Sequence, residues 1–397
     1  MIQINPPKYV RQILFTLQSR SHLAYLVGGC VRDVIMGMTP QDWDICTSAL
    51  PDEVLELFPG SRPTGLQHGT VTVIIGSKSA EVTTFRTEGD YRDHRRPDSV
   101  TFVSDLITDL SRRDFTMNAI ALSADGMLAD PFDGVHDIES RCIRCVGNPK
   151  VRFSEDALRM FRTLRFSARL GFTIEYDTLN AIEECAKEAS SLSPERVRDE
   201  VEKILLTPRP ETMSAAISFG LMNDYISGTG WKMPNFADMA NMPRKPLARW
   251  AAFSIMLRKY GYIPSVGEFL TKLRLDGRTI RCCKDADVIL SGNLPKDSLA
   301  WKKLLNRYGV DTVTCAVQAC SVISGEDFEK ELRAILKSGE CFSLKHLAVS
   351  GDDLLSLGLK GPELGEMLNF LLDYVMEYPD NNKREILLNL AKYSEES

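Results

Sequence analysis

The stretch AYLVGGCVRDVIMG, residues 24–37, joins a short apolar run to a helical pattern through two adjacent glycines. A second apolar run, WDIC (43–46), follows after a polar turn. Short runs of this kind, rich in β-branched residues and bounded by glycine, predict strands. Further strands are predicted at TVTVII (70–75), EVTTF (81–85) and NAIALSADGMLADPF (118–132), with helices at 31–37 and 51–58. From about Ala24 to Asp133 this alternation predicts a mixed sheet with helices packed on it.

After about Asn148 the pattern becomes helical and remains so to the end of the chain. Apolar residues recur at helical spacing, and Pro, Gly and Ser stand at the breaks. The clearest amphipathic stretches are EDALRMFRTLRFSARL (155–170), TLNAIEECAKEA (178–189), PERVRDEVEKILL (194–206) and ELGEMLNFLLDYVMEY (363–378). The sequence therefore predicts an α/β head followed by a long all-helical body.

The composition is that of a globular protein, with 44% hydrophobic and 26% charged residues among 397. At ~100–200 residues per domain, this length predicts two to four domains. The net charge of −6 argues against blanket coating of nucleic acid but says nothing about a local basic patch. No apolar run approaches the ~18 residues of a membrane span, so we expect no membrane association. Ten cysteines without an export signal predict reduced thiols in the cytoplasm.

Two sequence features could bind metal. Cys142 and Cys145 have the spacing of half a zinc site, but no second pair completes four ligands. Asp42 and Asp44 flank Trp43, and residues two apart in a strand face the same side, so both carboxylates would project together. Two such charges repel unless a cation or a shared proton lies between them. Magnesium prefers oxygen ligands, so Mg²⁺ is the expected cation. The alternative is an exposed turn.

A third acid, Glu81, opens the predicted strand EVTTF and could line up beside the aspartates. Three carboxylates on adjacent strands would be the ligand set of a two-metal phosphoryl-transfer site. Alternatively, Glu81 is a surface charge on an edge strand.

The double glycine, Gly28 and Gly29, lies between a predicted strand and a predicted helix. Glycines let the backbone approach a phosphate, and a helix N-terminus supplies N–H donors for the anion. Arg32, in the first turn, can add a charge-assisted contact. The alternative is a tight turn without a ligand.

A helix rich in arginine is predicted from a cap at Ser154, with Glu155 and Asp156 in its first turn. Ala157, Met160, Phe161, Leu164 and Ala168 share one face, and Arg159, Arg162, Arg165 and Arg169 lie roughly opposite. Between residues 150 and 172, six basic residues stand against two acidic ones, so the arginines would have few acidic partners. Arginine matches phosphate bidentately. The alternative is a solvated basic face.

Asp156 precedes Arg159 by one turn, so the two could offer an acceptor and a donor to the edge of a base. Two further arginine clusters support this interpretation, each of which could by itself be an ordinary charged loop. They are SRRDFTMNA (111–119) and the polar stretch YRDHRRPD (91–98).

These motifs, in this order, resemble those of the class II tRNA nucleotidyltransferases, the CCA-adding enzymes and their bacterial poly(A) polymerase relatives. The resemblance covers about the first 205 residues densely and returns faintly near LAVSGDDLLSLGLKGPELGEML (347–368). The motifs that carry it are VGGCVRD, QDWDI, EVTTFRTEGDYRDHRRPDSVTF, DLSRRDFTMNAIA, GMLADPFDG, RFSEDALRMFRTLRF and SPERVRDE.

The resemblance implies an α+β fold, in which a polymerase-β-like nucleotidyltransferase head with a mixed sheet precedes an all-helical neck, body and tail. The implied domains are the catalytic head (1–140), the neck with the nucleotide-selecting helix (141–206), the body (207–325) and the tRNA-binding tail (326–397).

The resemblance also assigns residues to roles. Asp42 and Asp44 would hold the metals, with Glu81 as the third acid. Gly28, Gly29 and Arg32 would bind the triphosphate, and Arg112 and Arg113 would contact the nucleotide. Asp156 and Arg159 would form the amino-acid template that pairs with CTP or ATP. Arg162 and Arg165 would continue that helix towards the phosphates and the base.

The implied activity is the addition of C, C and A to the 3′ end of tRNA, which the protein would contact at its 3′ end and acceptor/TΨC region. The segment at 91–98 corresponds to the flexible loop with which CCA-adding members switch from C to A, which favours the full activity. The alternatives that stay open are a CC-adding enzyme, an A-adding enzyme, a poly(A) polymerase and a non-catalytic RNA-binding protein. The sequence carries no signal for an oligomeric state.

Overall fold

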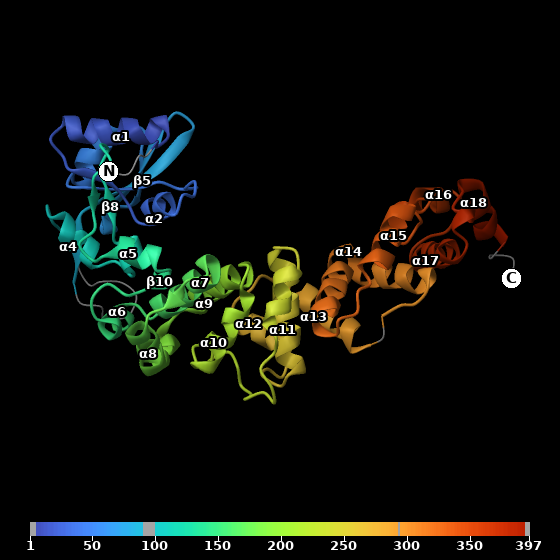
Figure 1. The fold of residues 1–397 in the computed structure, drawn as a ribbon. Helices are drawn as coiled ribbons and strands as arrows, with labels where there is room; N and C mark the ends of the chain where they lie inside the picture. The colour runs from blue at the N-terminus through green and yellow to red at the C-terminus, as the bar shows by residue number, and fades with distance from the viewer. Residues whose placement is uncertain (1–4, 90–99, 293, 394–397) are drawn as a thin grey trace. The chain divides into compact units, whose positions relative to one another are not determined.

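The computed structural model describes residues 5–89, 100–292 and 294–393, and it divides into two compact units, Met1–Asp224 and Tyr225–Ser397 (Figure 1). The first unit holds a seven-stranded mixed sheet and a set of helices. In its described residues the second unit contains helices and no strand. The prediction of an α+β head followed by a largely helical remainder is therefore confirmed.

The main sheet has the strand order β3-β4-β5-β2-β1-β8-β9. Its strands are β1 (Ala24–Val27), β2 (Asp44–Thr47), β3 (Arg62–Gly65), β4 (Thr70–Ile75), β5 (Lys78–Thr84), β8 (Ala121–Leu122) and β9 (Leu128–Ala129). In the described sheet β2 and β5 pair in parallel, and the other neighbouring strands pair antiparallel. A parallel pair needs a crossover between its strands, which α3 (Pro51–Leu57) and the β3–β4 hairpin supply.

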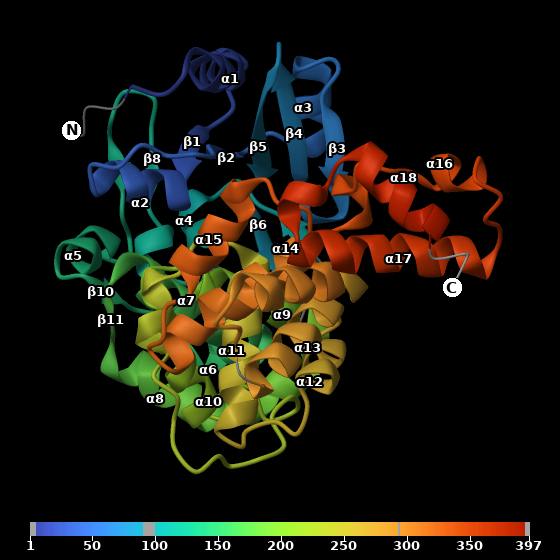
Figure 2. The same cartoon turned by 90° about the vertical axis from the view of Figure 1, so that its right-hand side faces the viewer.

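Helices cover one face of this sheet. Helix α1 (Lys8–Ser19) contacts α3, and both contact β5, while Figure 2 shows α3 beside β3 and β4. Val71, Val73 and Val82 are fully buried. The opposite face of β2 carries Cys46, which is buried in a cluster with Leu110 of α4 (Leu106–Ser111). The central strands are therefore packed on both faces, and polar groups gather at the strand ends.

The rest of the first unit follows the sheet and packs mainly as helices. Its elements are α2 (Gly29–Ile35), β6 (Arg86–Glu88), β7 (Val100–Phe102), η2 (Thr116–Asn118), α5 (Gly134–Glu139), β10 (Cys142–Ile143), α6 (Pro149–Glu155), α7 (Leu158–Leu170), β11 (Thr173–Ile174), α8 (Tyr176–Cys185), α9 (Pro194–Leu205) and α10 (Met213–Ser218). Short 3₁₀ turns complete it at η1 (Leu66–His68), η3 (Ala186–Ser191) and η4 (Pro210–Thr212).

The prediction that Ser154 caps the arginine helix is wrong. Ser154 lies inside α6, which starts at an Asn148 cap followed by Pro149. The chain then leaves helical geometry at Asp156 (φ −145°, ψ 102°), and α7 begins at Leu158. The Asp156 carboxylate accepts a hydrogen bond from the Leu158 backbone N–H at 3.1 Å, so Asp156 is the residue that satisfies the start of α7.

The second unit is built from helices. They are η5 (Phe236–Asn241), α11 (Pro246–Lys259), α12 (Val266–Lys272), α13 (Gly277–Ser291), α14 (Ser298–Ile323), α15 (Glu329–Ser338), η6 (Leu344–His346), α16 (Gly351–Leu355), α17 (Pro362–Glu377), η7 (Pro379–Asn381) and α18 (Arg384–Tyr393). Helix α14 is interrupted at Gly309, whose φ of 78° lies in the left-handed region that favours glycine.

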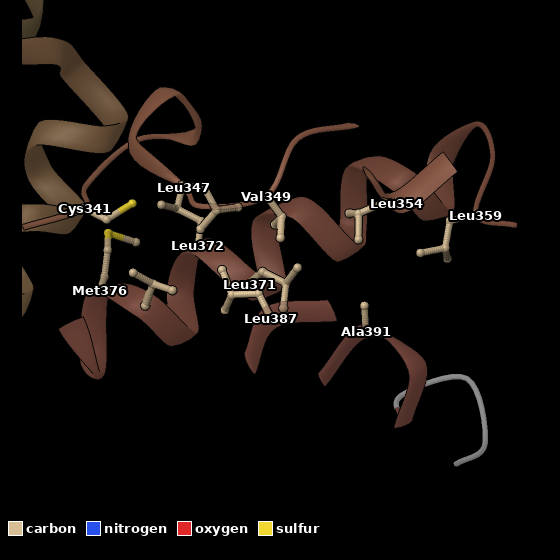
Figure 3. Packing of buried hydrophobic residues seen from close by; sticks show 11 residues of the cluster. Cys341, Leu347, Val349, Leu354, Leu359, Leu371, Leu372, Met376, Leu387 and Ala391 are labelled. Carbon is tan, nitrogen blue, oxygen red and sulfur yellow. The ribbon is translucent and has the colours of Figure 1, made fainter. Parts of the chain in front are cut away.

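The C-terminal end of this unit has a core of its own. Leu371 and Leu372 of α17 meet Leu354 of α16 and Leu387 of α18, and all four are buried (Figure 3). Burial of a leucine side chain stabilises a fold by roughly 1.5–3 kcal/mol, so this cluster fastens the three short helices together. Within the residues described, none of the helices has both the length and the apolar character that a bilayer span requires.

Candidate functional site

The parallel pairing of β2 with β5 places two carboxylates side by side. Asp44, the first residue of β2, is the Cα partner of Glu81, and both are exposed. Glu81 is the fourth residue of β5, so the expectation that it opens the strand is wrong. Asp42 lies in the bend before β2, where the alternation of a strand does not apply, and it too is exposed. Trp43, between the two aspartates in sequence, is buried (8% exposed).

The electrostatics of Asp44 reflect this crowding. Although its side chain reaches solvent, the surrounding protein desolvates the carboxylate, and this raises its pKa to about 6. The negative charge of Glu81 and, less strongly, that of Asp42 raise the pKa further, while Arg113 lowers it. Asp44 therefore carries a charge that its neighbours leave incompletely neutralised.

Gly28 brings the backbone close to this carboxylate. Because β1 and β2 pair antiparallel, the end of β1 lies beside the start of β2. Gly28 has a φ of +76°, and a Cβ atom there would lie 3.3 Å from Nη1 of Arg113 and 3.9 Å from Oδ2 of Asp44. A side chain at this position would therefore fill the space between the guanidinium and the carboxylate. Nε of Arg113 is buried and has no hydrogen-bond partner in the described chain.

Asp109 of α4 holds both neighbouring arginines. Its carboxylate is fully buried and accepts Nε and Nη2 of Arg112 at 3.0 and 2.8 Å, and Nη2 of Arg113 at 3.2 Å. The backbone N–H of Arg86 donates to the same carboxylate at 3.3 Å. One buried anion thus fixes two guanidinium groups, of which that of Arg113 lies next to Gly28, and sequence reasoning did not foresee this.

Arg32 is directed into the protein. It is 2% exposed, and its Nη1 donates to Oδ1 of Asn118 at 2.9 Å. Its Nε and Nη2 donate to Oδ1 of Asp33 at 3.0 and 2.6 Å. A Cβ atom on Gly29 would lie 3.7 Å from Nη2 of Arg32. The guanidinium therefore lies behind the double glycine.

Asp114 joins the head to the arginine helix α7. Its Oδ2 accepts Nε of Arg162 at 2.9 Å and Nη2 at 2.5 Å, and its Oδ1 accepts Nδ2 of Asn118 at 3.2 Å. Burial raises the pKa of this carboxyl, but Arg162 and the hydrogen bonds outweigh it and hold the pKa at about 2. Asp114 is therefore ionised at neutral pH and holds Arg162 in place.

Asp156 and Arg159 are joined through the backbone, where the Arg159 N–H donates to the Asp156 oxygen at 3.0 Å, and their side chains have other partners. Nη2 of Arg196, from α9, donates to both carboxylate oxygens of Asp156 at 3.1 and 2.8 Å. Arg159 is 8% exposed and donates to the backbone oxygens of Arg152 and Arg112 at 3.0 and 3.1 Å. Its guanidinium also pairs with Glu155. Arg196 therefore holds the side chain of Asp156, while Glu155 and two backbone oxygens hold that of Arg159.

The expectation that the arginine stripe has few acidic partners is wrong. The partners come from elements distant in sequence, in addition to Glu155. Arg165 pairs with Glu200 of α9 at 2.6 Å, Arg162 pairs with Asp114, and Arg169 lies 4.0 Å from Asp33. The apolar face is as predicted: Ala157, Met160, Phe161, Leu164 and Ala168 are all buried.

The donor set at β2 and β5 suits a hard cation, because it consists of carboxylates, and the pKa of Asp44 is raised by burial first and by the charge of Glu81 second. No three His, Cys, Asp or Glu side chains within residues 5–89, 100–292 and 294–393 already converge as a metal cluster. By charge and ligand type, the two aspartates and Glu81 are the residues at this place that would suit a cation. Cys142 and Cys145 belong to no metal cluster in the described chain, and burial raises the pKa of both thiols.

Sequence reasoning missed several side chains that position this site. Arg196 and Glu200 are four residues apart and so share one face of α9, a periodicity that the motif SPERVRDE carries. Asp109 of α4 shows a similar helical spacing, because it lies three residues before Arg112 and four residues before Arg113. The stretch at 91–98, which we expected to form a functional loop, lies outside the described residues.

Comparison with known families covers most of the chain. Residues 24–144 match the poly(A) polymerase head domain, and residues 171–226 match the family described as "Probable RNA and SrmB-binding site of polymerase A". Residues 244–391 match the family described as tRNA nucleotidyltransferase domain 2.

Individual proteins are similar over nearly the full length. The chain is 40% identical over 386 residues to the CCA-adding enzyme of Geobacillus sp. (strain WCH70), covering 94% of this chain and 93% of that protein. It is 35% identical over 396 residues to the CCA-adding enzyme of Lactiplantibacillus plantarum, covering 96% and 95%. The crystal structure of the Bacillus stearothermophilus CCA-adding enzyme in complex with CTP superposes with a TM-score of 0.82 at 31% identity, covering 99% and 98%.

The raised pKa of Asp44 predicts how stability depends on pH. An aspartate has a pKa of about 3.9 in an unfolded chain, against about 6 in this fold. The folded protein therefore binds an extra proton between these values, and stability is lost as the pH rises from about 4 to about 6. In EDTA, we expect Asp44→Asn to raise Tm at pH 7.5 and to leave it unchanged at pH 4. Parallel Tm curves for the two proteins across this range would contradict the assignment.

Removing the charge of Asp109 should release Arg112 and Arg113. We expect Asp109→Asn to destabilise the protein by about 3–5 kcal/mol, because two arginines lose their buried carboxylate. The matched control is Asp105→Asn on the same helix, since Asp105 is an exposed cap and asparagine also caps. Urea unfolding measures both variants. Equal midpoints for Asp109→Asn and Asp105→Asn would show that Asp109 does not carry this network.

Proposed function

This chain belongs to the CCA-adding enzymes, within the class II tRNA nucleotidyltransferase and poly(A) polymerase family, and we propose that it adds C, C and A to the 3′ end of tRNA from CTP and ATP. The observation that carries the proposal is the β2–β5 register, which sets Asp44 beside Glu81 next to Gly28 and Arg113. Transfer of a nucleotidyl group requires carboxylates that bind a cation. It also requires, beside them, a glycine and a guanidinium that can bind phosphate.

Members of this family typically use a divalent metal, and we infer that Asp42 and Asp44 hold Mg²⁺, with Glu81 as the neighbouring acid. When bound, such a cation lowers the pKa of the RNA 3′-hydroxyl and neutralises charge on the phosphates. The three carboxylates would attract the cation by their negative charge, which Arg113 offsets only in part.

The nucleotide would lie against the double glycine. Gly28 and Gly29 leave room for the triphosphate, and Arg112 and Arg113, both held by Asp109, would donate to it. Arg32, whose guanidinium lies behind the two glycines, would add positive charge near the triphosphate. Because the guanidinium groups are fixed before a ligand arrives, little rearrangement would be needed on binding.

The base would be read by the residues at the break between α6 and α7. Asp156 offers an acceptor held by Arg196, and Arg159 offers donors held by Glu155 and by two backbone oxygens. Arg162 and Arg165, fixed by Asp114 and Glu200, would extend this surface toward the phosphates and the base.

We further propose a division of labour along the chain and a cytoplasmic location. Residues 1–140 would be the catalytic head and 141–206 the neck, and these lie together in the first compact unit. The body (207–325) and the tail (326–397) would bind the acceptor/TΨC region of tRNA. Such contacts would go mainly to the RNA backbone and its shape.

Mass spectrometry of reaction products tests the activity. Purified protein, Mg²⁺, CTP and ATP are incubated with a tRNA that ends at the discriminator base. Growth by C, C and A followed by a stop is the expected result. Arrest after CC, addition of A only to a tRNA that already ends in CC, or long A tails would instead show a CC-adding enzyme, an A-adding enzyme or a poly(A) polymerase. No product from a folded, tRNA-binding protein would show a non-catalytic one.

Removal of either aspartate should separate catalysis from tRNA binding. We expect Asp42→Ala and Asp44→Ala each to lower nucleotide transfer by more than about 100-fold, because the cation loses an anionic ligand. The dissociation constant for tRNA should change little. Asp52→Ala, an exposed acid in the first turn of α3, is the control and should stay active. Loss of folding in either site variant would contradict the assigned role.

Arg159→Ala should blur the choice between C and A. Truncation of Arg159 removes the hydrogen-bond donors that would face the base, so that Asp156 alone would recognise it. We expect the ratio of kcat/KM for CTP over ATP at the first position to fall about tenfold or more. Arg198→Ala, whose arginine pairs with Asp199 on the neighbouring helix α9, serves as the control. Unchanged nucleotide selectivity in Arg159→Ala would refute the template assignment.

A further inference from the structure

Phe166 of α7 lies where cationic side chains converge. Its side chain is buried, and the guanidinium carbons of Arg32, Arg162 and Arg165 lie 5.2, 5.6 and 4.2 Å from the centre of its ring. The ring of Phe115 approaches it edge-on, with 5.6 Å between the centroids and 82° between the planes. A phenylalanine face carries partial negative charge and attracts cations at these distances.

The acids around these arginines fix each one separately. Arg32 is tied to Asp33, Arg162 to Asp114 and Arg165 to Glu200, and the three acids come from different elements. Asn118 links two of the arginines, because it accepts from Arg32 and donates to the Asp114 carboxylate that holds Arg162. The ring of Phe166 is a group that all three arginines contact, so it adds a second constraint on their spacing and offsets their mutual repulsion.

Two helices contribute arginines to this ring, and each begins at one end of the proposed nucleotide site: the double glycine at one end and Asp156 at the other. Arg32 belongs to α2, which starts at the double glycine, and Arg162 belongs to α7, which starts just after Asp156. We propose that Phe166 is a positioning residue whose ring holds Arg32 of α2 and Arg162 of α7 in register, so that the triphosphate and the base of one nucleotide are bound at a fixed separation. This inference rests on the proposed function, because it assigns the two ends of that same site.

Graded replacement of the ring tests the proposal. Phe166→Leu fills a similar volume without an aromatic face, and Phe166→3,4,5-trifluorophenylalanine keeps the shape while weakening the negative charge of the face. Phe172→Leu is the matched control, because Phe172 is equally buried just beyond α7 and no contact of its ring with an arginine is present in the described structure. The readouts are Tm and the separate kcat and KM values for CTP and ATP on tRNA acceptors.

We expect Phe166→Leu to raise KM for CTP and for ATP about tenfold, the factor that one cation–π contact of ordinary strength supplies. The KM values of the trifluorinated variant should lie between those of Phe166→Leu and those of wild type, and its Tm should equal that of wild type. Phe172→Leu should lower Tm and leave both KM values unchanged.

Wild-type KM values in the trifluorinated variant, or equal KM values for Phe166→Leu and Phe172→Leu, would overturn the positioning role. Wild-type protein that adds no nucleotide to tRNA would instead overturn the proposed function on which the role rests. The two failures are therefore distinguished by the activity of the unmodified chain.

Discussion

Uncompensated negative charge at the start of β2 is the constraint on which the rest of the site depends. The parallel register places Asp44 beside Glu81, and Asp42 adds a third charge two residues earlier in the chain. Such a group is costly to hold together without a cation, as the raised pKa of Asp44 reflects. The proposed divalent cation would supply the missing positive charge.

The arginines are kept from neutralising those carboxylates because other acids hold them. Asp109 takes Arg112 and Arg113, Asp114 takes Arg162, and Glu200 takes Arg165. Positive and negative charge therefore stay apart across the site, with Gly28 between them. A nucleotide triphosphate and its divalent cation together complement this separation, and fixed dipoles and charges of this kind supply catalysis without reorganisation.

Local patterns predicted β1, β2, β4 and β5 and the apolar face of α7, because each depends on neighbours in sequence. TVTVII is β4 to the residue, whereas Glu81 falls inside β5 since the strand continues through polar Lys78 and Ser79. Local patterns could not predict the break in the helix at Asp156 or the acidic partners of the arginines. They depend on Arg196 and Glu200 of α9 and on Asp114 of the head, which only the folded chain brings to α7.

The central claim is that the carboxylates at the start of β2 hold a divalent cation. Electron paramagnetic resonance of Mn²⁺, an oxygen-preferring substitute for Mg²⁺, measures this directly in the intact protein with CTP present. The account predicts bound Mn²⁺ in wild type and a loss of at least about tenfold in Mn²⁺ affinity in Asp42→Asn and in Asp44→Asn. Wild-type Mn²⁺ affinity in both variants would contradict it.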